Sequence, residues 1–206
     1  MDLFITYLFK SPQLFFTWLL VVVFSICCHE FMHAWIALKQ GDPTAADAGH
    51  LTLNPLRQMG TMSLIMLAIC GIAWGAVPVR PQLMRRRHSD ALVSFAGPAT
   101  NLVLFFVFSV LFYFLGGLGE AALLLFKLGA LLNMVLFIFN MLPIPGFDGF
   151  SILSSFFPRL REFNSEWMTG IYFIMFFLIF FSFEYLWLAA DFLLDLLLYG
   201  MQLVFG

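Results

Sequence analysis

Two histidines and a glutamate form a compact motif in the first quarter of the chain, His29-Glu30-Phe31-Met32-His33. Residues four positions apart project from one face of an α-helix, so the two imidazoles can bind the same metal ion. A glutamate beside the first histidine is placed to act as general base toward a water molecule at that metal. The motif therefore predicts a hydrolytic zinc site with His29 and His33 as ligands and Glu30 as base.

The motif lies inside an apolar segment, since residues 14–38 carry no other charged side chain. Ionisable side chains are costly within a membrane-spanning helix, and they usually mark a functional site there. The chemistry is therefore expected at membrane depth.

A second stretch, residues 140–149, supplies a candidate third ligand. Its two prolines stop a helix and force an extended backbone, and its two glycines permit a tight turn. Asp148 can then face inward from a loop, which is tolerated at membrane depth only where protein or a water-filled cavity covers it. With Asp148 as third ligand, the fourth zinc position stays open, as a catalytic site requires.

The composition identifies an integral membrane protein, because 62% of the 206 residues are hydrophobic and 11% are charged. Ordinary soluble domains carry about 25% charged residues. We predict an all-α polytopic membrane protein: one protease domain over 1–206, with a catalytic core at about 14–155 and C-terminal membrane helices at about 167–205. The bundle should contain about five to six membrane segments and short extended stretches. Apolar segments fall at 14–38, 61–77, 92–115, 121–142, 167–189 and 190–205.

The positive charges predict the orientation of these segments. Arg80 and the run Arg85-Arg86-Arg87 should be cytoplasmic, as should Lys39 after the first long segment. The histidines and Asp148 can meet only if 61–77 is re-entrant or shallow, since a full crossing would place them on opposite sides. The active site is then expected in the cytoplasmic half of the bilayer.

Other functions find little support in the sequence. The three arginines flank membrane segments and indicate topology, so no nucleic acid partner is expected. The cysteines lack metal-ligand spacing. A di-iron oxygenase needs more ligands than the four histidines supply. One open three-ligand site with an adjacent base suits catalysis better than zinc transport. An inactive pseudoprotease that binds membrane helices remains the alternative.

Four motifs taken together resemble the site-2 protease family of intramembrane zinc metalloproteases, in the minimal bacterial or archaeal form without a peptide-binding domain. The resemblance covers roughly residues 20–155. It departs from the family pattern at His50 and at 57–60. The motifs are HEFMH (29–33), GHLTLNPL (49–56), GPATN (97–101) and NMLPIPGFDG (140–149).

The resemblance implies one zinc ion per chain, held by His29, His33 and Asp148, with Glu30 as catalytic base. Asn140 matches an asparagine that helps to position the scissile peptide or its oxyanion, although a helix-end hydrogen bond explains it equally well. The implied location is the cell (inner or plasma) membrane, with several spans in the lipid bilayer. The implied reaction is regulated intramembrane proteolysis of a single-pass transmembrane substrate, such as an anti-sigma factor.

Overall fold

The computed structural model describes residues 3–86, 88–162 and 165–205. After η1 (Phe4–Thr6) and α1 (Tyr7–Lys10), the chain enters the long helix α2 (Pro12–Gln40) that carries the motif. Pro12 stands in the first turn, where proline is tolerated, and Gly41 ends the helix with φ +105°. Its 29 residues exceed the ~20 that a membrane span requires.

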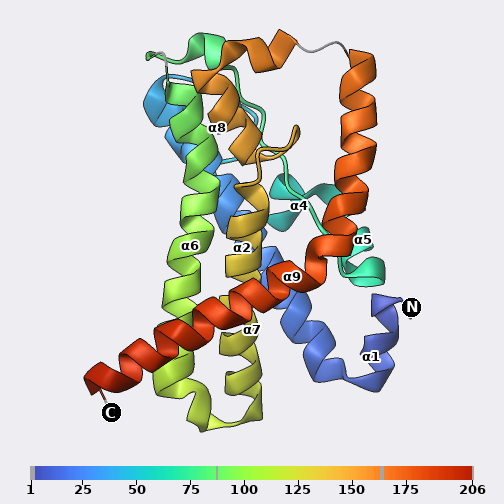
Figure 1. The fold of residues 1–206 in the computed structure, drawn as a ribbon, viewed down its shortest axis with the longest axis vertical. Coiled ribbons are helices and arrows are strands. Elements are labelled where there is room, and N and C mark those ends of the chain that lie inside the picture. Colours follow the sequence, from blue (N-terminus) through green and yellow to red (C-terminus); the bar gives the residue numbers. More distant parts are fainter. Residues whose placement is uncertain (1–2, 87, 163–164, 206) are drawn as a thin grey trace.

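Two further helices, α6 (Ser89–Leu115) and α7 (Glu120–Asn140), form an antiparallel hairpin joined by η3 (Gly116–Leu118). They lie beside α2 to form the central bundle (Figure 1). Two clusters of buried apolar side chains hold the bundle together, one between α2, α5 and α7 and one between α6, α7 and α9. The all-α architecture is confirmed, and the described residues contain no β-strand.

The segment between α2 and α6 does not cross the bundle. It contains α3 (Thr44–Asp47), α4 (Pro55–Gln58) and α5 (Gly60–Cys70), followed by extended backbone to η2 (Pro81–Leu83). The 11 residues of α5 are too few for a span. The chain turns at Gly71, with φ +76°, and returns to the end of the bundle where α2 finished (Figure 1). The predicted re-entrant segment is therefore confirmed.

The last part of the chain differs in one respect from the prediction. After α8 (Asp148–Phe156) and η4 (Pro158–Glu162), one helix, α9 (Ser165–Phe205), replaces the two segments expected at 167–189 and 190–205. Figure 1 shows that α9 is bent rather than broken. Most side chains of 167–189 lie outside the described residues. In the second half of α9, Asp191 pairs with Lys127 of α7 at 3.6 Å.

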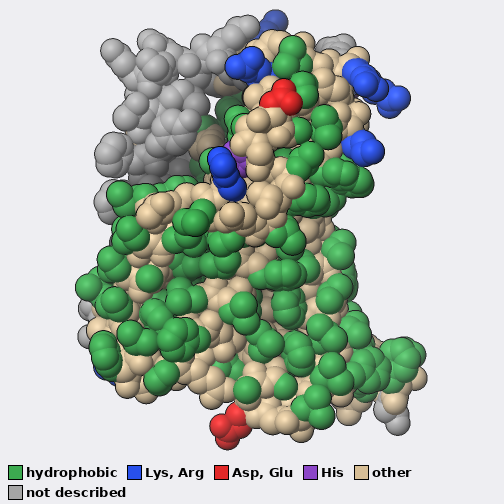
Figure 2. Space-filling view, turned by 180° about the vertical axis from the view of Figure 1, so that it is seen from behind, with side chains coloured by type: hydrophobic (Ala, Val, Ile, Leu, Met, Phe, Trp, Pro, Cys, Tyr) green, Lys and Arg blue, Asp and Glu red, His purple; other side chains and the backbone are tan. Residues whose placement is uncertain are grey.

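Four helices in the described part of the chain are long and apolar enough to cross a membrane. With the re-entrant segment they make five membrane segments. The surface carries a broad band of hydrophobic side chains, and Lys and Arg gather at the end where α2 finishes and α6 begins (Figure 2). This distribution is typical of a multi-pass membrane protein with basic residues on one side. The four candidate spans are Pro12–Gln40, Ser89–Leu118, Glu120–Asn140 and Glu184–Phe205.

Candidate metal centre and active site

The two motif histidines lie on one face of α2 and are buried in the bundle. Their Nε2 atoms are 2.9 Å apart, and their rings meet edge to face with centroids 4.6 Å apart. The structure therefore brings both imidazoles to one point, as the four-residue spacing predicted.

Hydrogen bonds on the far side of each ring fix its orientation. His29 Nδ1 lies 2.6 Å from Asn101 Oδ1, and His33 Nδ1 lies 2.7 Å from the Val93 carbonyl oxygen. Both partners are on α6, and both oxygens can only accept, so each Nδ1 carries the proton and donates it. Each neutral imidazole then presents an Nε2 lone pair to the centre. Such outer hydrogen bonds orient the histidine ligands in metal sites.

Asp148 completes the group from a different element. It is the first residue of α8, rather than part of a loop as predicted, and its Oδ2 lies 3.1 Å from His29 Nε2 and 3.4 Å from His33 Nε2. The preceding turn uses Gly146 with φ +98°. Gly149 is required for close packing, because a Cβ there would collide with the backbone carbonyls of Met141 and Leu142.

The three atoms that converge here fit a zinc ion. Two imidazole lone pairs and a carboxylate are all hydrogen-bond acceptors, so they repel one another unless a cation lies between them. Spacings of 2.9–3.4 Å allow one point to lie about 2.1 Å from each atom, the distance that zinc prefers. In the part of the chain that the structure describes, no other set of three such residues has this geometry.

Gly97 of α6 keeps the centre open. A Cβ at this position would overlap the Nε2 atoms of both His29 and His33. Only glycine leaves space for a metal ion and its open position. In the sequence, Gly97 stands out only as part of the GPATN motif, because its place against the ligands depends on how α6 is rotated.

A cavity of about 300 Å³ opens beside these ligands and contains Glu30 in its wall. The extended backbone at Gly75 lies so close to the Glu30 side chain that a Cβ there would overlap it. Asn140 also lines the cavity, and its Nδ2 donates to the Leu136 carbonyl oxygen at 2.9 Å. The four predicted catalytic or ligand positions on α2 and α8, together with Asn140, therefore face one cavity.

A buried polar chain supports the site from behind. Asn101 Nδ2 donates to Asn133 Oδ1 at 3.0 Å, and Asn133 Nδ2 donates to Ser25 Oγ at 2.9 Å. These residues are on α6, α7 and α2, and all three are fully buried. The network joins the three central helices to His29. Polar side chains within apolar spans are the sequence signal by which its members could have been found.

The loop in which the sequence departs from the family pattern has a structural role. Gln58 is buried, and its Nε2 donates to the carbonyl oxygens of His50 at 2.8 Å and Thr52 at 2.5 Å. Asn54 caps α4 by accepting from the Leu56 N–H at 3.0 Å. These bonds fix the conformation of the loop.

Comparison with known proteins yields several matches. The model of peptidase family M50 matches residues 118–182. The Bacillus subtilis protein named "Putative zinc metalloprotease YwhC" is 37% identical over 169 residues, which are 77% of this chain and 75% of that protein. Two further matches are also named "Putative zinc metalloprotease": Rip2 of Mycolicibacterium smegmatis and MJ0611 of Methanocaldococcus jannaschii.

Rip2 is 38% identical over 144 residues, which are 63% of this chain and 52% of that protein. MJ0611 is 31% identical over 163 residues, which are 72% of this chain and 77% of that protein. No solved structure gives a significant match. The similarity to YwhC extends over most of both chains and agrees with the family model and the motifs. The chain therefore belongs to peptidase family M50, the site-2 proteases.

Proposed function

We propose that this protein is an intramembrane zinc metalloprotease that hydrolyses a peptide bond within, or at the edge of, a substrate's transmembrane segment. One observation carries the proposal. The Nε2 atoms of His29 and His33 and a carboxylate oxygen of Asp148 converge on a cavity that also contains Glu30, inside an apolar bundle. The names of the relatives agree with zinc as the metal, and the single three-residue group among the described residues agrees with one ion per chain.

Each residue has a defined task in this reaction. When bound by His29, His33 and Asp148, zinc would supply a Lewis acid that polarises a carbonyl and acidifies water. Glu30 takes a proton from the attacking water and later delivers it to the leaving amide nitrogen. Burial of Glu30 beside the ligands keeps this proton transfer away from bulk water. Asn140 is proposed to donate its remaining amide N–H to the substrate peptide or its oxyanion.

The substrate must unwind before it can react, because the carbonyls of an intact helix are hydrogen-bonded and shielded. The extended backbone from Gly75 to Val79 lines the same cavity as the ligands. In this stretch the Ala76 N–H donates to the Gln58 carbonyl oxygen at 3.1 Å, which fixes the segment to α4 on its other side. An unwound substrate could add to the segment as a second strand.

We place the reaction in the cytoplasmic half of the membrane. The histidines are in the second half of α2, toward the end of the bundle where Lys and Arg gather (Figure 2). By the positive-inside rule, that end faces the cytoplasm. Single-pass proteins whose helices enter from the lipid are then the proposed substrates, with anti-sigma factors as the class that the family resemblance implies.

The direct test is cleavage by the purified chain, reconstituted in lipid vesicles with a transmembrane peptide whose helix is interrupted by Gly and Pro. Wild type should cleave the peptide, and Glu30→Gln should not, although it retains its zinc. Cleavage by Glu30→Gln at the wild-type rate would refute the role of Glu30. A wild type that binds zinc and peptide without cutting any such substrate would instead indicate a pseudoprotease.

A further inference from the structure

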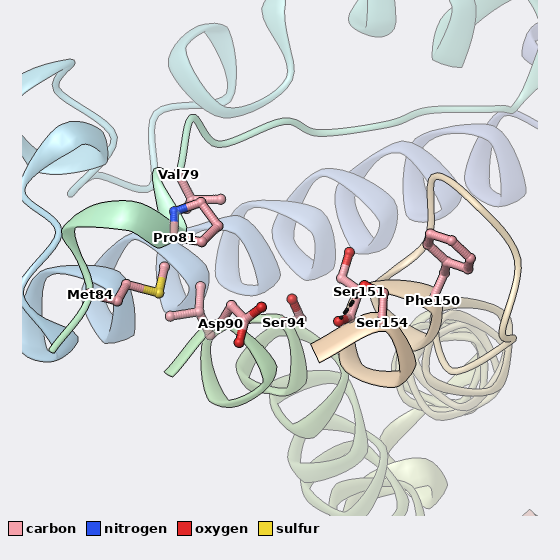
Figure 3. Close-up of a pocket in the computed structure, with 9 residues that line it drawn as sticks. Val79, Pro81, Met84, Asp90, Ser94, Phe150, Ser151 and Ser154 are labelled. Atoms are coloured by element: carbon pink, nitrogen blue, oxygen red, sulfur yellow. Dashed lines mark hydrogen bonds between the residues drawn. The ribbon is translucent and has the colours of Figure 1, made fainter. Parts of the chain in front are cut away.

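A second cavity, of about 260 Å³, lies next to the metal centre and is not used by the proposed mechanism. It is bordered by three elements: the loop at 79–84, the first turns of α6 and the face of α8 (Figure 3). Its apolar walls include Val79 and Met84 from the loop, Val93 from α6 and Phe150 from α8.

The two cavities share part of their walls. Val79, Val93, Ser94 and Ser151 line both of them. Val93 also supplies the carbonyl oxygen that accepts from His33. A peptide whose reacting carbonyl lies at the metal centre therefore has a neighbouring side chain within reach of the second cavity.

Two polar side chains of the second cavity, Asp90 and Ser154, form hydrogen bonds within the protein. Asp90 accepts from Ser155 Oγ at 2.6 Å and from the Ala91 N–H at 2.9 Å, and Ser154 Oγ donates to the Ser151 carbonyl oxygen at 3.1 Å. Among the described residues, no buried side-chain nitrogen or oxygen lacks a hydrogen-bond partner. The other polar side chains of the lining are the neutral hydroxyls of Ser94 and Ser151, so the larger apolar part of the wall determines which side chain fits.

We propose that this cavity is the specificity pocket for the substrate residue next to the scissile bond, and that it takes a large apolar side chain of the size of Leu, Met or Phe. The proposal rests on the proposed function, since the metal centre must hold the reacting carbonyl. The volume agrees with this occupant, because it is several times the ~30 Å³ that one water molecule takes up. A transmembrane substrate offers such side chains in most positions.

The test uses peptidyl hydroxamates, which bind a catalytic zinc directly and differ here in one side chain beside the hydroxamate: methyl, isobutyl or benzyl. Their affinities are measured by titration calorimetry on the purified, zinc-loaded full chain in detergent. Wild type should bind the isobutyl and benzyl compounds at least about ten-fold more tightly than the methyl compound, because an apolar pocket favours the side chain with more methylene groups by about this factor. Equal affinity for all three compounds would overturn the pocket and leave the metal centre intact.

Variants on the pocket wall give the matched comparison. Met84→Trp should fill the cavity and remove the ten-fold preference. Leu83→Trp changes the neighbouring, exposed residue outside the lining and should keep the preference. A preference that survives in Met84→Trp would contradict the assignment.

A variant that gains affinity provides a second test, because a folding defect would not increase binding. Met84→Ala enlarges the cavity, so this variant should gain affinity for a naphthylmethyl compound relative to wild type. No gain would count against the pocket. If wild type held zinc but bound none of the hydroxamates, the proposed function itself would fail, and this result differs from equal binding of all of them.

Discussion

Gly97 provides a test of the metal centre that leaves every ligand in place. In Gly97→Ala, the new methyl group would overlap the Nε2 atoms of His29 and His33, where the zinc ion must bind. The backbone of α6 tolerates the change, because alanine favours a helix over glycine by about 1 kcal/mol. The substitution should therefore abolish metal binding without unfolding the helix.

The expected effect on zinc affinity is large. Loss of an outer hydrogen bond to a metal ligand costs about 10–100-fold in affinity. A methyl group between the ligands themselves should cost at least the upper figure, about 2.8 kcal/mol. Neither imidazole can rotate away at no cost, because His29 is held by Asn101 and His33 by the Val93 carbonyl.

The assay is zinc content after dialysis against a graded series of chelator concentrations, with helicity measured by circular dichroism. Gly200→Ala is the matched control, because Gly200 is also helical but has open space around its Cβ position. The control should keep wild-type zinc content. Wild-type zinc affinity in a folded Gly97→Ala would refute the placement of the metal between the two histidines.

Three further outcomes follow from single positions. Asn101→Leu should lower zinc affinity about 10–100-fold, because it removes the hydrogen bond that orients one imidazole; unchanged affinity in a chelator titration would argue against that role. Burial raises the pKa of Asp42, but hydrogen bonds from the Arg80 and Thr44 N–H groups outweigh this effect and hold the pKa below its usual value. The ionised Asp42 carboxylate therefore stabilises the fold fully above the ordinary Asp pKa of about 3.9, and this stabilisation is lost as the pH falls through the lower folded-state pKa. Asp42→Asn should make the free energy of unfolding depend less on pH in the acid range, as monitored by circular dichroism. An unchanged acid-unfolding profile would contradict this. Gly149→Ala should lower the free energy of unfolding by about 1–3 kcal/mol through collision with two backbone carbonyls, measured by denaturant titration in detergent, and unaltered stability would show that the turn relaxes freely.

Much of the site could be predicted because its determinants are local. The spacing of His29 and His33 places them on one helical face in any α-helix, and the prolines after Asn140 end α7 wherever it packs. The re-entrant segment was predicted from topology, because the histidines can meet Asp148 only if this segment does not cross the membrane. Each of these predictions depends on short-range geometry or on the side of the membrane.

Other features depend on how the helices are rotated against one another, which the sequence does not state locally. Gly97 and Gly75 are recognisable as small residues, but their closeness to the imidazoles and to Glu30 appears only once α6 and the extended segment are packed. The hydrogen bonds from Asn101 through Asn133 to Ser25 depend on how three helices are aligned along their axes. Asp148 begins a helix instead of lying in a loop, because α8 starts directly after the turn at Gly146.

The central claim, a zinc ion held by two histidines of α2 and one aspartate of α8, is tested most directly by metal analysis of the purified chain. Wild type and Asp195→Ala, which removes an exposed carboxylate on α9, should each contain one zinc per chain. Asp148→Ala, folded to the same extent, should have lost its zinc or bind it far more weakly. A wild type without zinc after expression in zinc-supplemented medium would contradict the metal centre, and full zinc content in Asp148→Ala would contradict its third ligand.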